Sequence, residues 1–182
     1  MSLPNPGMVF TAFDPLPAAS LNDIVANVEA LAAGTGLDIN SISASKLSDS
    51  AITLGYAQIT TTISTTSTSF VAAPGLSKTV TIPDGGRNVE ITVFVYALSN
   101  TIAGSLSIID LWDGSVGTGT EIQRAQVTSS TNAAGVAVTM VSFVSSPAAG
   151  SKTYSVGYRA TANSTSINCG ATFPAFILIK LV

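Results

Sequence analysis

The segment from Asn88 to Leu98 has the sequence NVEITVFVYAL, and its alternation decides the fold class of the chain. Every second position holds a β-branched aliphatic residue, namely Val89, Ile91, Val93 and Val95. Successive side chains of an extended strand point to opposite faces, so these four share one face. β-Branched residues also pack well on a pleated surface. The segment is therefore predicted to be a β-strand with one aliphatic face on a core.

The whole region from 56 to 182 has this organisation, with short apolar segments separated by turn residues. Further strands are predicted at Tyr56–Ser64, Ser77–Ile82, Gly104–Trp112, Glu121–Ser129, Gly135–Val144, Lys152–Ala162 and Phe173–Val182. The pattern gives about eight or nine strands, and no helical period interrupts them, which disfavours a parallel βαβ architecture. The expected fold is mainly β, an antiparallel β-sandwich that is jelly-roll-like or another Greek key.

The last predicted strand differs from the others because Ala175–Val182 shows almost no polar alternation. Both of its faces are therefore expected to be buried. In a monomer this implies a central strand. In an oligomer, one face could instead meet a neighbouring subunit.

The residues before the sandwich divide into an extended arm, 1–17, and an oligomerising segment, 18–55. Proline recurs in the arm at Pro4, Pro6, Pro15 and Pro17 and prevents regular structure there. The arm still carries apolar side chains that are expected to dock, either on the chain's own domain or on another protein: Met8, Val9, Phe10, Phe13 and Leu16.

One short helix is predicted from Ser20 to Ala33, with Ser20 as its N-cap and Gly34 as its stop. Its apolar stripe consists of Leu21, Ile24, Val25, Val28 and Leu31. A thin shaft follows, from Thr35 to Gly55, in which Ile39, Ile42, Leu47 and Ile52 stand among polar residues. Because so few apolar residues cannot fold alone, the shaft is expected to pack against copies of itself. The five residues of the helical stripe and the four apolar residues of the shaft together are the predicted oligomer interface.

Composition excludes several functions. Charged residues make up only 9% of the chain and the net charge is -3, so no basic face is present to bind nucleic acid. No segment approaches the roughly 20 apolar residues needed for membrane insertion. The first nine residues do not resemble a secretory signal, so we expect synthesis in the cytoplasm.

Little catalytic chemistry is available. The chain has no histidine, which removes the usual general base, and its one cysteine, Cys169, excludes an internal disulfide. Asp110, Asp113 and Glu121 are the only acids dense enough to suggest a glycosidase pair or a calcium site, and we favour the structural explanation, a strand end for Asp110 and a turn for Asp113. We expect no catalytic residue, no metal and no cofactor.

A ligand contact is conceivable at Trp112 and Asp113, where the lone tryptophan stands at a predicted strand end. Its ring could stack on a sugar of a host surface glycan. Burial of Trp112 in the core is the explanation that we favour.

Several short sequences along the first third of the chain resemble those of tailed-bacteriophage fibre and appendage proteins: Asn5-Pro6-Gly7-Met8, Phe13-Asp14-Pro15-Leu16, Leu31-Ala32-Ala33-Gly34-Thr35-Gly36, Ala44-Ser45-Lys46-Leu47 and Asp49-Ser50-Ala51-Ile52-Thr53. The resemblance implies a homotrimer on the outside of a virion. It implies that the arm anchors to a capsid, portal or tail protein, that helix and shaft trimerise, and that the sandwich faces outward. A head fibre, a tail adaptor and a receptor-binding tip all fit it.

The leading hypothesis is therefore a non-enzymatic virion structural protein for head decoration or host attachment. A stand-alone carbohydrate-binding module, using Trp112 and a tyrosine, is the alternative. A polysaccharide-degrading enzyme that uses acids alone is a third hypothesis, which the scarcity of carboxylates disfavours.

Overall fold

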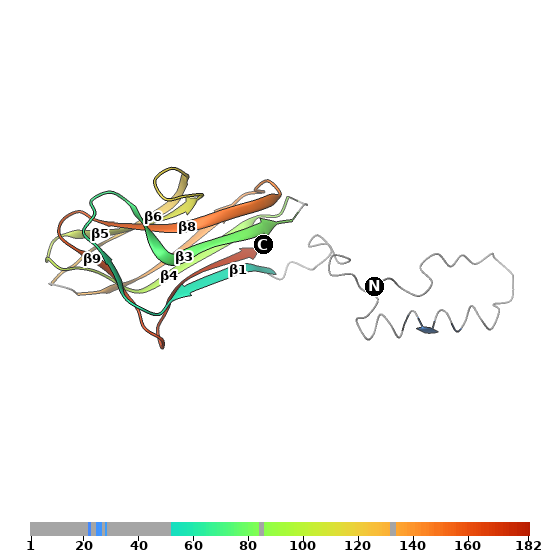
Figure 1. Cartoon of the computed structure of the whole chain (residues 1–182), viewed down its shortest axis with the longest axis horizontal. Helices are drawn as coiled ribbons and strands as arrows, with labels where there is room; N and C mark the ends of the chain where they lie inside the picture. The colour runs from blue at the N-terminus through green and yellow to red at the C-terminus, as the bar shows by residue number, and fades with distance from the viewer. Residues whose placement is uncertain (1–21, 23–24, 27, 29–51, 84–85, 132–133) are drawn as a thin grey trace. The chain divides into compact units, whose positions relative to one another are not determined.

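A computed structural model describes residues 22, 25, 26, 28, 52–83, 86–131 and 134–182 (Figure 1). The chain divides into two compact units, Met1–Ser48 and Asp49–Val182. In the first unit, the described residues Asn22, Val25, Ala26 and Val28 are helical, in agreement with the predicted helix, and Val25 and Val28 are exposed. The other residues of the predicted arm, helical stripe and shaft lie outside the described residues, apart from Ile52: Met8, Val9, Phe10, Phe13, Leu16, Leu21, Ile24, Leu31, Ile39, Ile42 and Leu47.

The second unit is an antiparallel β-sandwich, as the sequence predicted (Figure 1). Its described residues form ten strands: β1 (Ile52–Ile59), β2 (Ile63–Thr65), β3 (Val71–Ile82), β4 (Val89–Asn100), β5 (Leu106–Asp113), β6 (Thr120–Thr128), β7 (Val136–Val144), β8 (Gly150–Ala160), β9 (Thr165–Asn168) and β10 (Ala175–Leu181). One sheet has six strands in the order β1-β10-β4-β9-β2, with β7 also paired to β4. The other has four strands in the order β3-β8-β5-β6.

The aliphatic face of β4 lies in the core, as predicted. Val89, Ile91, Val93 and Val95 are all fully buried. Buried side chains of the four-stranded sheet complete the core, among them Ile109, Leu111, Tyr154 and Val156. Burial of this much apolar surface is the main favourable contribution to folding.

Strand β10 occupies a central position between β1 and β4, which agrees with the prediction from its apolar sequence. Only one of its faces is fully buried, however. Ala175, Ile177, Ile179 and Leu181 point into the core, whereas the alternate side chains Phe176, Leu178 and Lys180 are half-buried. The expectation of two buried faces is therefore not met within one subunit, because no layer of the described sandwich covers the outer side of this sheet.

Within the part of the chain that the structure describes, no helix has the length and apolar character needed to cross a bilayer.

Candidate functional site

The acidic residues singled out in the sequence lie on the four-stranded sheet, where β5 runs antiparallel to β6. This register sets Asp110 opposite Arg124, whose Nε and Nη2 donate hydrogen bonds to the Asp110 carboxylate at 3.1–3.3 Å. Arg124 Nη2 also donates to Glu121 Oε2 at 2.7 Å. Asp113 is held separately by Lys152, whose Nζ lies 3.2 Å from Asp113 Oδ2. The structure thus brings Asp110 and Glu121 together through one guanidinium.

The carboxyl group of Asp110 is fully buried although it points away from the main core. Burial raises its pKa from 3.8 to about 6, and the repulsion of Glu121 adds to the rise, while the hydrogen bonds from Arg124 oppose it. The pKa of Arg124 is raised by the same hydrogen bonds. A carboxyl group whose pKa lies near neutral pH is a feature of some catalytic sites. The Asp110 side chain, however, has no exposed surface that a substrate could contact.

Aromatic side chains pack beside the Arg124 guanidinium that binds Asp110. Two guanidinium groups lie over the Phe70 ring, that of Arg124 at 5.1 Å and that of Arg159 at 4.9 Å from the ring centroid. Its edge also meets Trp112, with 6.0 Å between ring centroids. Trp112 is therefore only 8% exposed, and its Nε1–H is buried without a hydrogen-bond partner. The residue predicted to stack on a sugar offers little ring surface to one.

Gly157 makes this packing possible. A Cβ atom at Gly157 would lie 2.8 Å from Val116 Cγ1 and 3.0 Å from Trp112 Nε1, closer than such atoms normally approach. The absence of a side chain on β8 therefore lets Trp112 and the loop residue Val116 settle against the strand.

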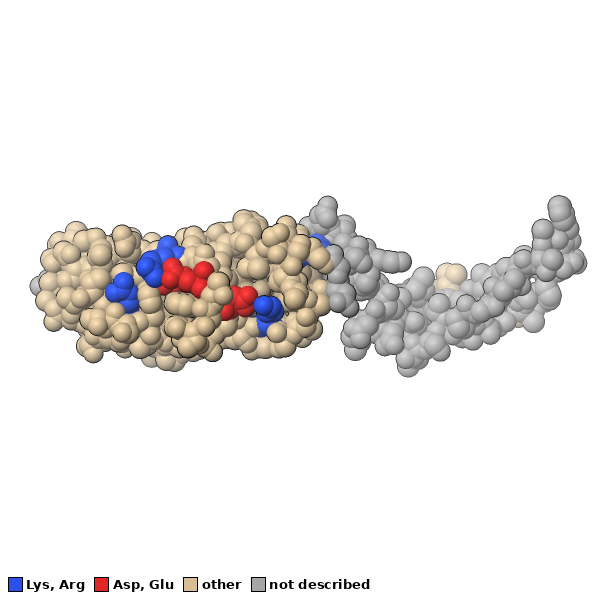
Figure 2. All heavy atoms as spheres, turned by 90° about the horizontal axis from the view of Figure 1, so that it is seen from above, with Lys and Arg blue, Asp and Glu red and all other residues tan. Residues whose placement is uncertain are grey.

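Ion pairing extends to all four acidic residues that the structure describes in the sandwich. Glu90 pairs with Lys180 across β4 and β10, with 4.0 Å between Oε1 and Nζ, and the other three acids pair as described above. Figure 2 shows red and blue atoms of such pairs in contact on one face of the sandwich, surrounded by uncharged surface. Among the described residues, no group of three potential metal ligands comes together.

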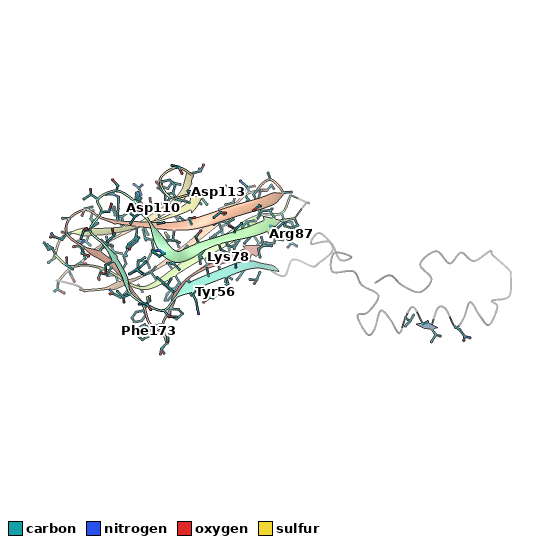
Figure 3. All side chains as sticks on the ribbon, viewed as in Figure 1. Tyr56, Lys78, Arg87, Asp110, Asp113 and Phe173 are labelled. Carbon is teal, nitrogen blue, oxygen red and sulfur yellow. The ribbon has the colours of Figure 1, made fainter. Side chains whose placement is uncertain are left out.

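The opposite side of the sandwich has a different character. Figure 3 shows Tyr56 and Phe173 on the side of the sandwich away from Asp110 and Asp113. The outward side chains of the six-stranded sheet form a surface that we name the aromatic face, defined by Tyr56 of β1, Phe94 and Tyr96 of β4, Val141 and Phe143 of β7, and Phe176 of β10.

The aromatic face was not predicted as a site from the sequence. Its signal was present in the segment Asn88–Leu98, where Phe94 and Tyr96 stand on the side of the strand that an exposed antiparallel sheet would make polar. The same signal was present in β10, where Phe176 and Leu178 interrupt the expected polar alternation. Only the pairing of β1, β10, β4 and β7 shows that these residues form one surface.

Comparisons with known proteins give fold-level likenesses only. No protein-family model matches the chain, and no curated protein sequence matches it. Among solved structures, Eiger TNF from S. frugiperda is 12% identical with a TM-score of 0.41, covering 72% of this chain and 92% of that one. A carbohydrate-binding module of lichenase 5A from Cellvibrio mixtus, in complex with cellotriose, is 16% identical with a TM-score of 0.36, covering 70% and 97%.

A viral structure is also similar to the sandwich. A chain in the structure of the infectious bursal disease virus Gx strain is 11% identical to this chain, with a TM-score of 0.38. The match covers 72% of this chain and 31% of the viral chain. Likenesses with identities and TM-scores this low indicate nothing about function.

Proposed function

We propose that this chain is a non-enzymatic structural protein of a bacteriophage particle. In this proposal three copies form an appendage whose sandwich is displayed outward for head decoration or host attachment. Residues 1–17 attach the appendage to a capsid, portal or tail protein. The observation that carries the proposal is the complete ion pairing of the acids described in the sandwich.

The pairing matters because subunit contacts exclude water. An unpaired carboxylate is costly to desolvate, whereas uncharged polar side chains cost much less and apolar side chains gain from burial. In the described sandwich each acid has a cationic partner in Arg124, Lys152 or Lys180, so covering it with a neighbour buries no acid that lacks a partner. The same pairing leaves Asp110, tied to Arg124 and fully buried, poorly suited to act on a substrate.

Attachment to a particle rests on the amino-terminal sequence. The arm contains more apolar residues than we expect of a segment that contacts nothing. The short sequences around these residues resemble those of phage appendage proteins. The location on the virion exterior follows from the same resemblance.

The proposal is tested by the molar mass of the full chain in solution, measured by size-exclusion chromatography with light scattering. One chain has a mass of 18.4 kDa. We expect a mass three times that of one chain. A monomer at every accessible concentration would contradict the homo-oligomeric proposal.

A stand-alone carbohydrate-binding module is the second candidate, and one observation favours it. Tyr96 and Phe173 stack with 4.4 Å between ring centroids and are 47% and 44% exposed. Exposed aromatic rings of this kind bind sugars through their faces. Calorimetric titration with a panel of oligosaccharides tests this function, which requires saturable binding that Tyr96→Ala abolishes.

A further inference from the structure

The outer side of the six-stranded sheet is unusually apolar for a surface that faces solvent. The aromatic face contributes four strongly exposed side chains, Tyr56 (43%), Tyr96 (47%), Val141 (46%) and Phe143 (63%). None of the exposed large hydrophobic residues described in the sandwich lies on a strand of the other sheet. Clustering on one sheet, rather than scatter over the surface, is what marks an interaction site.

Strand register makes the aromatic face continuous. Tyr56 lies opposite Leu178, Leu178 opposite Thr92, and Thr92 opposite Val141, so one row of side chains crosses four strands. In the neighbouring row Phe176 lies directly opposite Phe94.

The rings of the aromatic face also contact one another. Ring centroids are 5.5 Å apart for Phe94 and Phe176, and 5.7 Å apart for Tyr56 and Phe176. Rings held in this way lose little conformational entropy when a partner covers them.

The charges on this side are balanced. Among the outward residues of β1, β10, β4 and β7, only Glu90 and Lys180 are charged, and they form an ion pair. A partner that covers the aromatic face therefore buries no unpaired charge. A second copy of the chain would bring its own Glu90 and Lys180, so opposite charges are available on both partners.

The size of the aromatic face is adequate for a subunit contact. Four strands spaced about 4.8 Å apart give a width of about 19 Å. The nine residues of β7 give a length of about 30 Å at roughly 3.3 Å per residue. The flat area of about 570 Å² is of the same order as the roughly 800 Å² that each partner buries in a standard interface.

From these observations we infer that the aromatic face is the contact surface between copies of this chain. The inference rests on the proposed function, because it requires copies to associate. It differs from the expectation that the amino-terminal helix and shaft alone hold the oligomer. The sandwich itself takes part, through β1, β10, β4 and β7.

The test compares full-length variants by light scattering and sedimentation at equal protomer concentration. The substitutions Phe143→Lys and Val141→Lys each place a cation in the aromatic face. In Phe143→Lys the new cation lies opposite Glu90, so we expect the single subunit to fold with it. Ile102→Lys is the matched control, since Ile102 is 43% exposed but lies outside this surface. Circular dichroism melting verifies that each variant is folded. A fourth variant, Ile24→Asp with Val28→Asp, charges the predicted helix stripe.

We expect each aromatic-face variant to weaken association at least about tenfold, which corresponds to about 1.4 kcal/mol. Ile102→Lys should leave the mass unchanged. If the aromatic-face variants keep the wild-type mass, another segment or partner covers this surface and the inference is overturned. The proposed function survives that result, particularly if the helix variant dissociates. A monomeric wild-type protein would overturn both.

Discussion

Asp110 should make the protein less stable as the pH rises from 4 to 6. Burial raises the pKa of its carboxyl group from 3.8 in the unfolded chain to about 6 in the folded one, so the folded state holds this proton more tightly. Over that window the free energy of unfolding falls with pH. The whole shift, at 1.36 kcal/mol per pKa unit, amounts to about 3 kcal/mol, of which about 2 kcal/mol is lost between pH 4 and pH 6.

Asp110→Asn isolates this effect because the amide keeps the shape of the side chain and a hydrogen-bond acceptor for Arg124 but does not titrate. Chemical unfolding is followed at pH 4, 5, 6 and 7 by circular dichroism and by the fluorescence of Trp112, the single tryptophan, at one protomer concentration. The difference between wild type and variant should change by about 2.4 kcal/mol across this range, in favour of the variant at high pH, because the rest of the effect falls below pH 4.

Arg124→Met provides the opposing control. It removes the hydrogen bonds and the charge that lower the pKa of Asp110, so that pKa should rise further and the loss of stability should extend to higher pH. The reasoning is refuted if Asp110→Asn and wild type show the same pH dependence, or if the stability of wild type relative to Asp110→Asn increases from pH 4 to 6.

Two further predictions concern the packing around Trp112. Gly157→Ala should destabilise the sandwich by about 1–3 kcal/mol, because the new methyl group meets Val116 and Trp112, and adding Val116→Ala should restore part of the loss in a thermal melt. Phe70→Ala should increase the quenching of Trp112 fluorescence by acrylamide, since the ring that packs against the indole is removed, and an unchanged quenching constant would contradict that packing.

Hydrophobic alternation was sufficient to predict the larger strands. β4, β7 and β10 contain runs long enough to show their period, and their bounds agree with the predicted segments to within a few residues. β9 was missed because Thr165–Asn168 is four residues long and mostly polar, so it depends on pairing with β4 rather than on its own sequence. The first part of β3 was missed because Pro74 and Gly75 break the pattern at a bulge.

The pairing around Asp110 could not be predicted in the same way. The sequence shows three acids close together but does not reveal which residue on β6 will face which on β5, and a bulge at Leu111 and Trp112 shifts that register. Strand register is set by tertiary packing, and a slip of one residue would send Arg124 to the other side of the sheet. The burial of Trp112 likewise depends on Phe70, which lies far away in the sequence.

The two outer surfaces of the sandwich both carry few charged residues, but their apolar side chains are covered to different extents. On the four-stranded sheet, side chains of the chain itself cover the apolar groups: Phe70 and Arg124 close over Trp112 and Asp110. On the six-stranded sheet no described segment does so, and Phe143 remains 63% exposed. Because the outward side of β10 carries Phe176 and Leu178 beside Lys180, its sequence is explained fully only if something covers that side. A second subunit would supply this covering from the same sequence.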